Sequence, residues 1–161
     1  MVTEEFKKIA VSFAGGDGGN PKSEVWFCGL EWGIGDESSP DDFYEKFSLS
    51  PKLIPHSWVE DDFDGSWTTQ YNRKICWFLW YYYNLDWKNG ESAEHFVKKY
   101  DVLYPQGIGF KLNMLPINFK NRSSIQWNEQ FIKLTGFETF DEYRDWCVEN
   151  RGAFYRQLID E

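Results

Sequence analysis

One carboxylate stands on a glycine-spaced turn that directly follows an apolar run. The run and the turn together read VWFCGLEWGIG, residues 25–35, and Glu31 is the one acid among them. Aromatic and β-branched residues bounded by glycines are typical of a buried strand, and such strands deliver functional groups at their C-terminal ends. Gly29, Gly33 and Gly35 would let the backbone adopt positive φ angles and approach a ligand closely. Glu31 is therefore a candidate site residue; the alternative is a plain turn with a solvated carboxylate.

A second apolar run carries an amide. Residues 109–117 read GFKLNMLPI, with Asn113 among apolar neighbours. An amide in a buried strand must find hydrogen-bond partners, because leaving it unpaired costs about 1–3 kcal/mol. Asn113 is thus either satisfied within the fold or held at the strand end to bind a ligand. Pro116 suits a strand end, since it lacks a backbone donor.

The remaining polar candidates are two histidines and one acidic cluster. His56, in PHSW, could act as a general acid or base, although no partner is visible in the sequence. His95 is expected on the surface of a helix. The acidic cluster is interpreted as a solvated loop, with metal binding and mimicry of DNA phosphates as alternatives; it comprises Glu60, Asp61, Asp62 and Asp64.

The cysteines argue against a metal centre. Cys28, Cys76 and Cys147 lie far apart in apolar surroundings and show no ligand spacing. We expect them to be small buried hydrophobic residues in a reducing compartment, and we expect neither a metal nor a cofactor.

Composition bounds the class of protein. The 161 residues are enough for one domain, 1–161, and an aromatic fraction of 20% is too high for a disordered chain. The net charge of −9 argues against a strong electrostatic grip on nucleic acid, although a local basic cluster is present at Lys111, Lys120 and Arg122. No signal peptide and no apolar run of about 18 residues is visible, which predicts a soluble, cytoplasmic protein without membrane contact.

Periodicity predicts the elements that would position these residues. Strands are expected at 25–30 and 109–117, and helices at 3–13, 41–47, 67–84 and 92–104, with further helices from 126 to 161 interrupted at Gly136. The helix at 67–84 is aromatic all round in its second half, which indicates core burial, a partner surface or a stacking platform for bases. Its residues at helical spacing are Trp67, Tyr71, Ile75, Phe78, Leu79 and Tyr82. The predicted fold class is α/β, with a small, mostly parallel central sheet flanked by helices.

This order of elements resembles the uracil-DNA glycosylase superfamily. The family's first strand ends in a Gly-x-x-x-Gly/Tyr turn, and the sequence Gly29-Leu30-Glu31-Trp32-Gly33 is similar to it. The resemblance implies that Glu31 activates or orients the hydrolytic water and that Asn113 hydrogen-bonds a flipped base. Gly29 and Gly33 would shape the site, and Trp32 or an aromatic residue from the loop after Gly33 would stack on the base. The fold would then be uracil-DNA-glycosylase-like.

The chain also departs from the family's pattern. The family usually has proline where this chain has Trp32, and its second motif, a histidine-containing loop, would follow a helix such as 150–160. The chain ends at Glu161, so the fold is either truncated at its C-terminus or that of a shortened relative without catalysis.

Three functional interpretations follow. The first is a glycosylase-like protein that binds a flipped base in DNA or hydrolyses its N-glycosidic bond. The second is a noncatalytic, acidic, aromatic-rich module that binds a protein partner, including a DNA-mimic regulator. The third is an unrelated α/β enzyme that acts on a small molecule through Glu31.

Overall fold

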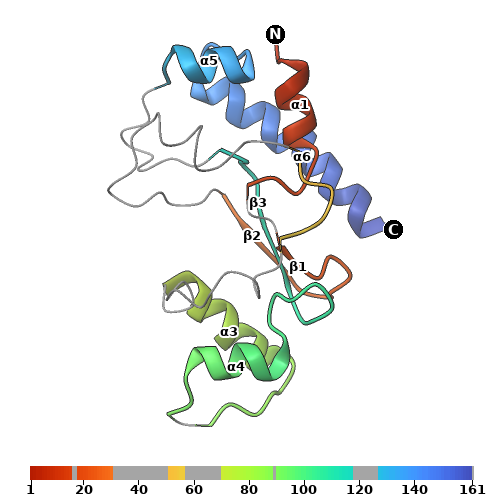
Figure 1. Cartoon of the computed structure of the whole chain (residues 1–161), viewed down its shortest axis with the longest axis vertical. Coiled ribbons are helices and arrows are strands. Elements are labelled where there is room, and N and C mark those ends of the chain that lie inside the picture. Colours follow the sequence, from red (N-terminus) through yellow and green to blue (C-terminus); the bar gives the residue numbers. More distant parts are fainter. Residues whose placement is uncertain (16–17, 31–50, 57–69, 89, 118–126, 161) are drawn as a thin grey trace. The chain divides into compact units, whose positions relative to one another are not determined.

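The structure is a computed structural model that describes residues 1–15, 18–30, 51–56, 70–88, 90–117 and 127–160 (Figure 1). The described chain has a mixed α/β fold. It divides into two compact units, each built from separate stretches of sequence. Unit 1 comprises Met1–Asp17, Cys28–Ile54 and Leu112–Glu161, and unit 2 comprises Gly18–Phe27 and Pro55–Lys111. The single domain expected from chain length stays a prediction.

Three short strands form the sheet of the described chain, in the order β1-β3-β2. Their bounds are Gly18–Gly19 for β1, Trp26–Gly29 for β2 and Phe110–Asn113 for β3. β1 is antiparallel to β3, with Gly18 opposite Lys111. β2 is parallel to β3, because two amides four residues apart along and just after β3 bond to carbonyls that are four residues apart along β2 and just before it: Phe110 N to Val25 O at 3.0 Å and Met114 N to Gly29 O at 2.9 Å.

The prediction of a mostly parallel sheet is therefore wrong for the described strands, which form a mixed sheet. Two glycines of the glycine-rich segment that precedes β2, Gly18 and Gly19, pair with β3 as β1. Glycine has weak strand propensity, so sequence patterning gives no signal for such a strand.

The described part of unit 1 contains three helices, which pack through α1: α1 (Glu4–Ala10), α5 (Glu129–Thr135) and α6 (Phe140–Asp160). Thr3 is the N-cap of α1, as its Oγ1 accepts a bond from Phe6 N at 3.1 Å. The same hydroxyl donates to Leu134 O at 2.5 Å and so ties α1 to α5. The expected stop after α5 is confirmed, since Gly136 ends it with a φ of 82°. A buried apolar cluster fills the unit: Phe6, Ala10, Leu115, Ile117, Phe131, Tyr143 and Cys147.

Unit 2 contains α3 (Gln70–Tyr82) and α4 (Ala93–Tyr100), which pack on one another. Ser92 caps α4, because its Oγ accepts a bond from His95 N at 3.2 Å. The core of the unit is formed by one side of α3, by α4 and the residues after it, and by the residue before β2; its buried members are Val25, Ile75, Cys76, Leu79, Phe96, Val97, Val102 and Leu103.

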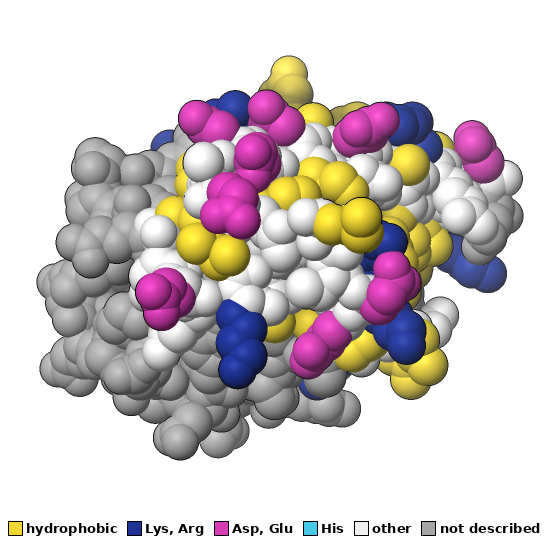
Figure 2. Space-filling view, turned by 90° about the horizontal axis from the view of Figure 1, so that it is seen from above, with side chains coloured by type: hydrophobic (Ala, Val, Ile, Leu, Met, Phe, Trp, Pro, Cys, Tyr) yellow, Lys and Arg dark blue, Asp and Glu magenta, His cyan; other side chains and the backbone are white. Residues whose placement is uncertain are grey.

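The described surface is chemically mixed. Figure 2, viewed from above relative to Figure 1, shows apolar side chains scattered among Asp, Glu, Lys and Arg on that face. No helix in the described ranges is long and apolar enough to cross a membrane.

Candidate functional site

The ends of β2 and β3 lie side by side in unit 1. Their pairing continues past the strands, since Leu115 N donates to Leu30 O at 2.7 Å. A Cβ placed on Gly29 would overlap the side-chain oxygen of Asn113, so a glycine is needed there for the two strand ends to meet. The glycine-turn strand and the asparagine strand, about 80 residues apart in sequence, are thus direct neighbours.

The turn itself lies beyond what the structure describes. Glu31, Trp32 and Gly33 fall outside the described residues, as does the acidic cluster at 60–64. Of the predicted site residues, Gly29 and Asn113 are described. The roles assigned to all five stay predictions.

The Asn113 amide is anchored within unit 1. The side chain is 2% exposed, and its Nδ2 donates to Gly15 O at 2.9 Å. Gly15 has a φ of 85° and passes so close to Pro116 that a Cβ would lie 2.8 Å from the Pro116 Cα. The segment after α1 therefore fixes the orientation of the amide, which leaves Oδ1 against Gly29.

The main chain of Asn113 is held by a buried cation that the sequence analysis did not single out. Arg151, on α6, is fully buried, and its Nε donates to Asn113 O at 2.8 Å. Tyr155 Oη donates to the same carbonyl at 3.0 Å, and the guanidinium lies 5.2 Å from the centre of the Tyr155 ring.

Arg151 also closes the C-terminal end of α1. Nη1 donates to Ala10 O at 2.8 Å and to Ser12 O at 3.1 Å, and Nη2 donates to Ala14 O. A cation is favourable at this helix end, where the carbonyl groups lack partners and carry partial negative charge. The fork of Arg151 thus fixes α1, β3 and α6 against one another. The sequence contains one weak signal for Arg151. On a helix it lies on the same side as two buried residues, Cys147 one turn earlier and Tyr143 two turns earlier.

Two buried ionisable side chains near Arg151, those of Tyr143 and Cys147, stay protonated. Burial raises the pKa of Tyr143 well above its usual value, and Ile117 N donates to its hydroxyl oxygen at 3.1 Å. Burial likewise raises the pKa of the Cys147 thiol to about 12. Both are neutral core groups at physiological pH.

The other two cysteines, Cys76 and Cys28, differ in burial. Cys76 is buried, which raises its pKa to about 12, in line with the expectation of a buried thiol. Cys28 is exposed, so the expectation of burial is wrong for this residue. It lies on β2, whose side chains alternate between the two faces of the sheet.

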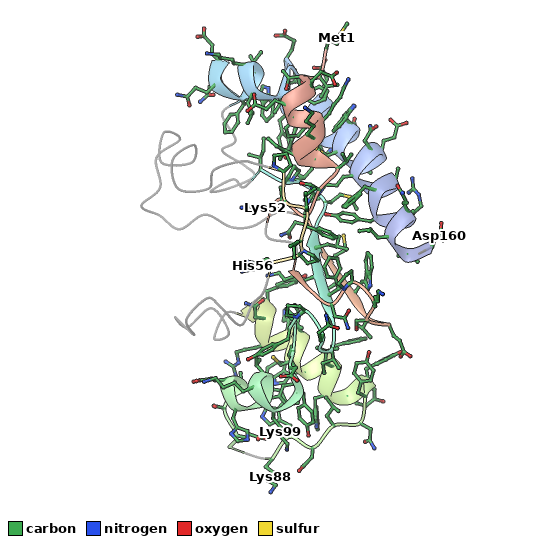
Figure 3. The ribbon with its side chains drawn as sticks, turned by 45° about the vertical axis from the view of Figure 1, so that its right-hand side comes forward. Met1, Lys52, His56, Lys88, Lys99 and Asp160 are labelled. Atoms are coloured by element: carbon green, nitrogen blue, oxygen red, sulfur yellow. The ribbon has the colours of Figure 1, made fainter. Side chains whose placement is uncertain are left out.

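The two histidines lie in different surroundings. His56, labelled in Figure 3, is half-buried, and its carbonyl accepts a bond from Gly19 N at 3.0 Å. His95 lies on the exposed side of α4 as expected, with Nε2 3.0 Å from Glu91 Oε1. The described residues contain no group of three or more His, Cys, Asp or Glu that could hold a metal ion.

The predicted basic cluster is described only at Lys111. This side chain is 8% exposed, its Nζ donates to Asn72 Oδ1 at 3.3 Å, and it lies 5.0 Å from the centre of the Tyr71 ring. Lys120 and Arg122 are outside the described residues.

A second candidate surface lies on α3. Of the alternatives given for this helix, core burial is wrong for Tyr71, Phe78 and Tyr82, which are all exposed. The buried side of α3 is instead formed by Asn72, Ile75, Cys76 and Leu79. We call the exposed rings the α3 aromatic face; they are 40–82% exposed and comprise Tyr71, Trp77, Phe78, Trp80, Tyr81 and Tyr82.

Comparisons of the chain with protein-family models, with characterised proteins and with solved structures find no match.

Proposed function

We propose that the protein is uracil-DNA-glycosylase-like and binds a flipped nucleobase of DNA at the adjoining ends of β2 and β3. The observation that carries this proposal is the parallel pairing of these strands, with Met114 N bonded to Gly29 O. Ligand sites of α/β sheets lie at the carboxyl ends of parallel strands. In this chain β2, which leads into the glycine turn, and β3, which carries Asn113, have neighbouring carboxyl ends.

In this proposal Glu31 orients water for N-glycosidic hydrolysis and Trp32 stacks on the extruded base. Asn113 contributes the amide that binds the base edge. The bond from Asn113 Nδ2 to Gly15 O sets the plane of the carboxamide. An amide held in one orientation binds a matching base edge more tightly than one that rotates, because less conformational entropy is lost on binding.

One observation favours a noncatalytic protein-interaction module as the second candidate. Asn113 is 2% exposed, and its amide and carbonyl both bond to the protein itself. Such bonding is what a purely structural asparagine requires. In that case the strand ends would stabilise the fold, and the acidic surface, including a DNA-mimic arrangement, would contact a protein.

The two candidates are separated by a strand that contains one deoxyuridine. Fluorescence anisotropy would measure binding to this strand and to the matched thymidine strand, and alkaline cleavage would measure base release. The first proposal expects tighter binding of the deoxyuridine strand, with affinity falling as salt rises.

Single substitutions test the roles proposed for Glu31 and Asn113. Glu31→Gln is expected to abolish any base release while sparing binding, whereas Glu24→Gln, at an exposed carboxylate before β2, leaves both unchanged. Asn113→Ala is expected to remove the preference for deoxyuridine. Absence of DNA binding at low salt would refute the first proposal and leave the interaction module.

A further inference from the structure

We propose that the α3 aromatic face is a stacking surface for single-stranded DNA, separate from the strand-end site. The inference rests on the proposed function for its choice of DNA as the ligand. The residues that form this surface belong to unit 2, in which Lys88 and Lys99 are labelled in Figure 3.

The exposed rings are not needed to form the core. The buried side of α3 already supplies aliphatic and thiol side chains, with Ile75 at 2% and Leu79 at 0% exposure. Trp77 and Phe78 each remain 49% exposed and Tyr81 remains 82% exposed. A run of large exposed rings costs solubility and marks an interaction site when it is contiguous on one element.

Two rings of the α3 aromatic face already stack on each other. Phe78 and Tyr82 lie 5.7 Å apart with their planes 14° from parallel, and Phe27 meets Phe78 edge-on at 5.6 Å. Rings that are fixed by neighbours lose little freedom when a base is added to the stack. Base–aromatic stacking tolerates any sequence, because every base presents a π-face.

The charges on α3 favour a polyanion. The helix carries Arg73 and Lys74 but no Asp or Glu, in a chain whose formal charge is −9. The Arg73 guanidinium lies 5.4 Å from the centre of the Trp77 ring, which places a phosphate-binding cation beside an exposed ring. Arginine is suited to phosphate contacts because its planar fork binds two oxygens at once.

The same charges limit the strength of binding. Two cations neutralise about two phosphates, so the logarithm of the binding constant is expected to fall with the logarithm of salt with a slope of about −1.4. Stacking therefore contributes most of the affinity, and loss of one ring is expected to weaken binding about tenfold.

The experiment uses the full chain and a fluorescein-labelled thymidine oligonucleotide of about 16 nucleotides, followed by anisotropy. Trp77→Ala and Tyr81→Ala are each expected to weaken binding about tenfold. Arg73→Gln is expected to weaken it and to make the salt slope shallower by about 0.7. Arg156→Gln, which removes an exposed arginine of α6, is the matched control and should leave affinity unchanged.

Circular dichroism of each variant verifies folding, which these exposed positions should not alter. Equal oligonucleotide binding by wild type and the α3 variants would overturn the inference while leaving the strand-end proposal standing. Retained α3-dependent binding without preference for deoxyuridine would refute the strand-end proposal alone. Absence of any oligonucleotide binding refutes both, and binding of a polyglutamate peptide instead would assign the α3 aromatic face to an acidic protein.

Discussion

Replacement of the buried Arg151 by methionine is the most stringent test of the packing in unit 1. The change keeps most of the aliphatic volume and removes the guanidinium that donates to Ala10 O, Ser12 O and Ala14 O. Asn113 O keeps its bond from Tyr155, so three carbonyls lose this donor. Each buried carbonyl left unpaired costs about 1–3 kcal/mol.

Three such carbonyls would cost about 3–9 kcal/mol, and relief from desolvating the guanidinium offsets part of this. We expect a loss of about 3–5 kcal/mol in the free energy of unfolding, similar to the removal of one partner from a buried ion pair. Domains are stable by about 5–15 kcal/mol, so the methionine variant is expected to be marginal. Arg151→Lys keeps the charge but places three donors on one nitrogen, so its expected loss is smaller than that of the methionine variant.

The assay is urea unfolding followed by the fluorescence of the nine tryptophans, with linear extrapolation to water. Arg156→Met, at an exposed position of the same helix, is the control and should change stability by no more than about 0.5 kcal/mol. The reasoning is refuted when Arg151→Met costs no more than Arg156→Met, or when the lysine variant is as unstable as the methionine variant.

Three further predictions follow from local geometry. Thr3→Ala removes a helix cap and the bond to α5, so urea unfolding should show a loss of about 1–2 kcal/mol; no loss would contradict the capping role. Gly29→Ala forces its Cβ against Asn113 Oδ1, with an expected loss of about 1–3 kcal/mol, and a neutral result would mean the strand ends are further apart. The buried thiols of Cys76 and Cys147 should react with a disulfide reagent only on unfolding, after the exposed third thiol. The pKa of both thiols is about 12 in the folded protein against 9.0 normally. Their contribution to the free energy of unfolding is therefore complete below pH 9.0 and should decrease as the pH rises from there. A free energy of unfolding that does not change over this range would count against their burial.

Much of the local structure could be predicted from sequence because it depends on neighbouring residues. Caps at Thr3 and Ser92 and the stop at Gly136 are set by side chains within a turn of the helix they end. The two main strands were expected from apolar runs, and both are observed inside those runs at a shorter length, Trp26–Gly29 and Phe110–Asn113.

The α3 helix shows where periodicity was insufficient. Its second half has apolar residues at nearly every position, so a period of 3.6 can be fitted to several faces. The observed buried face includes Asn72 and Cys76, whereas Phe78 and Tyr82 face outward. Asn72 accepts a bond from Lys111 on β3, a tertiary contact that no pattern within α3 indicates.

The contacts of Arg151 could not be predicted from the sequence, for a more general reason. Its partners are main-chain carbonyls up to 141 residues away, and carbonyls carry no sequence signature. This arrangement also makes the functional test on Asn113 clean. Arg151 and Tyr155 hold the Asn113 main chain, whereas Gly15 holds only its side chain. Truncation to alanine removes the side-chain bond to Gly15 O, which costs about 1–3 kcal/mol, and leaves the two bonds to the Asn113 main chain in place. A loss of base preference in a variant that unfolds almost as wild type does would then report on ligand contact and not on the fold.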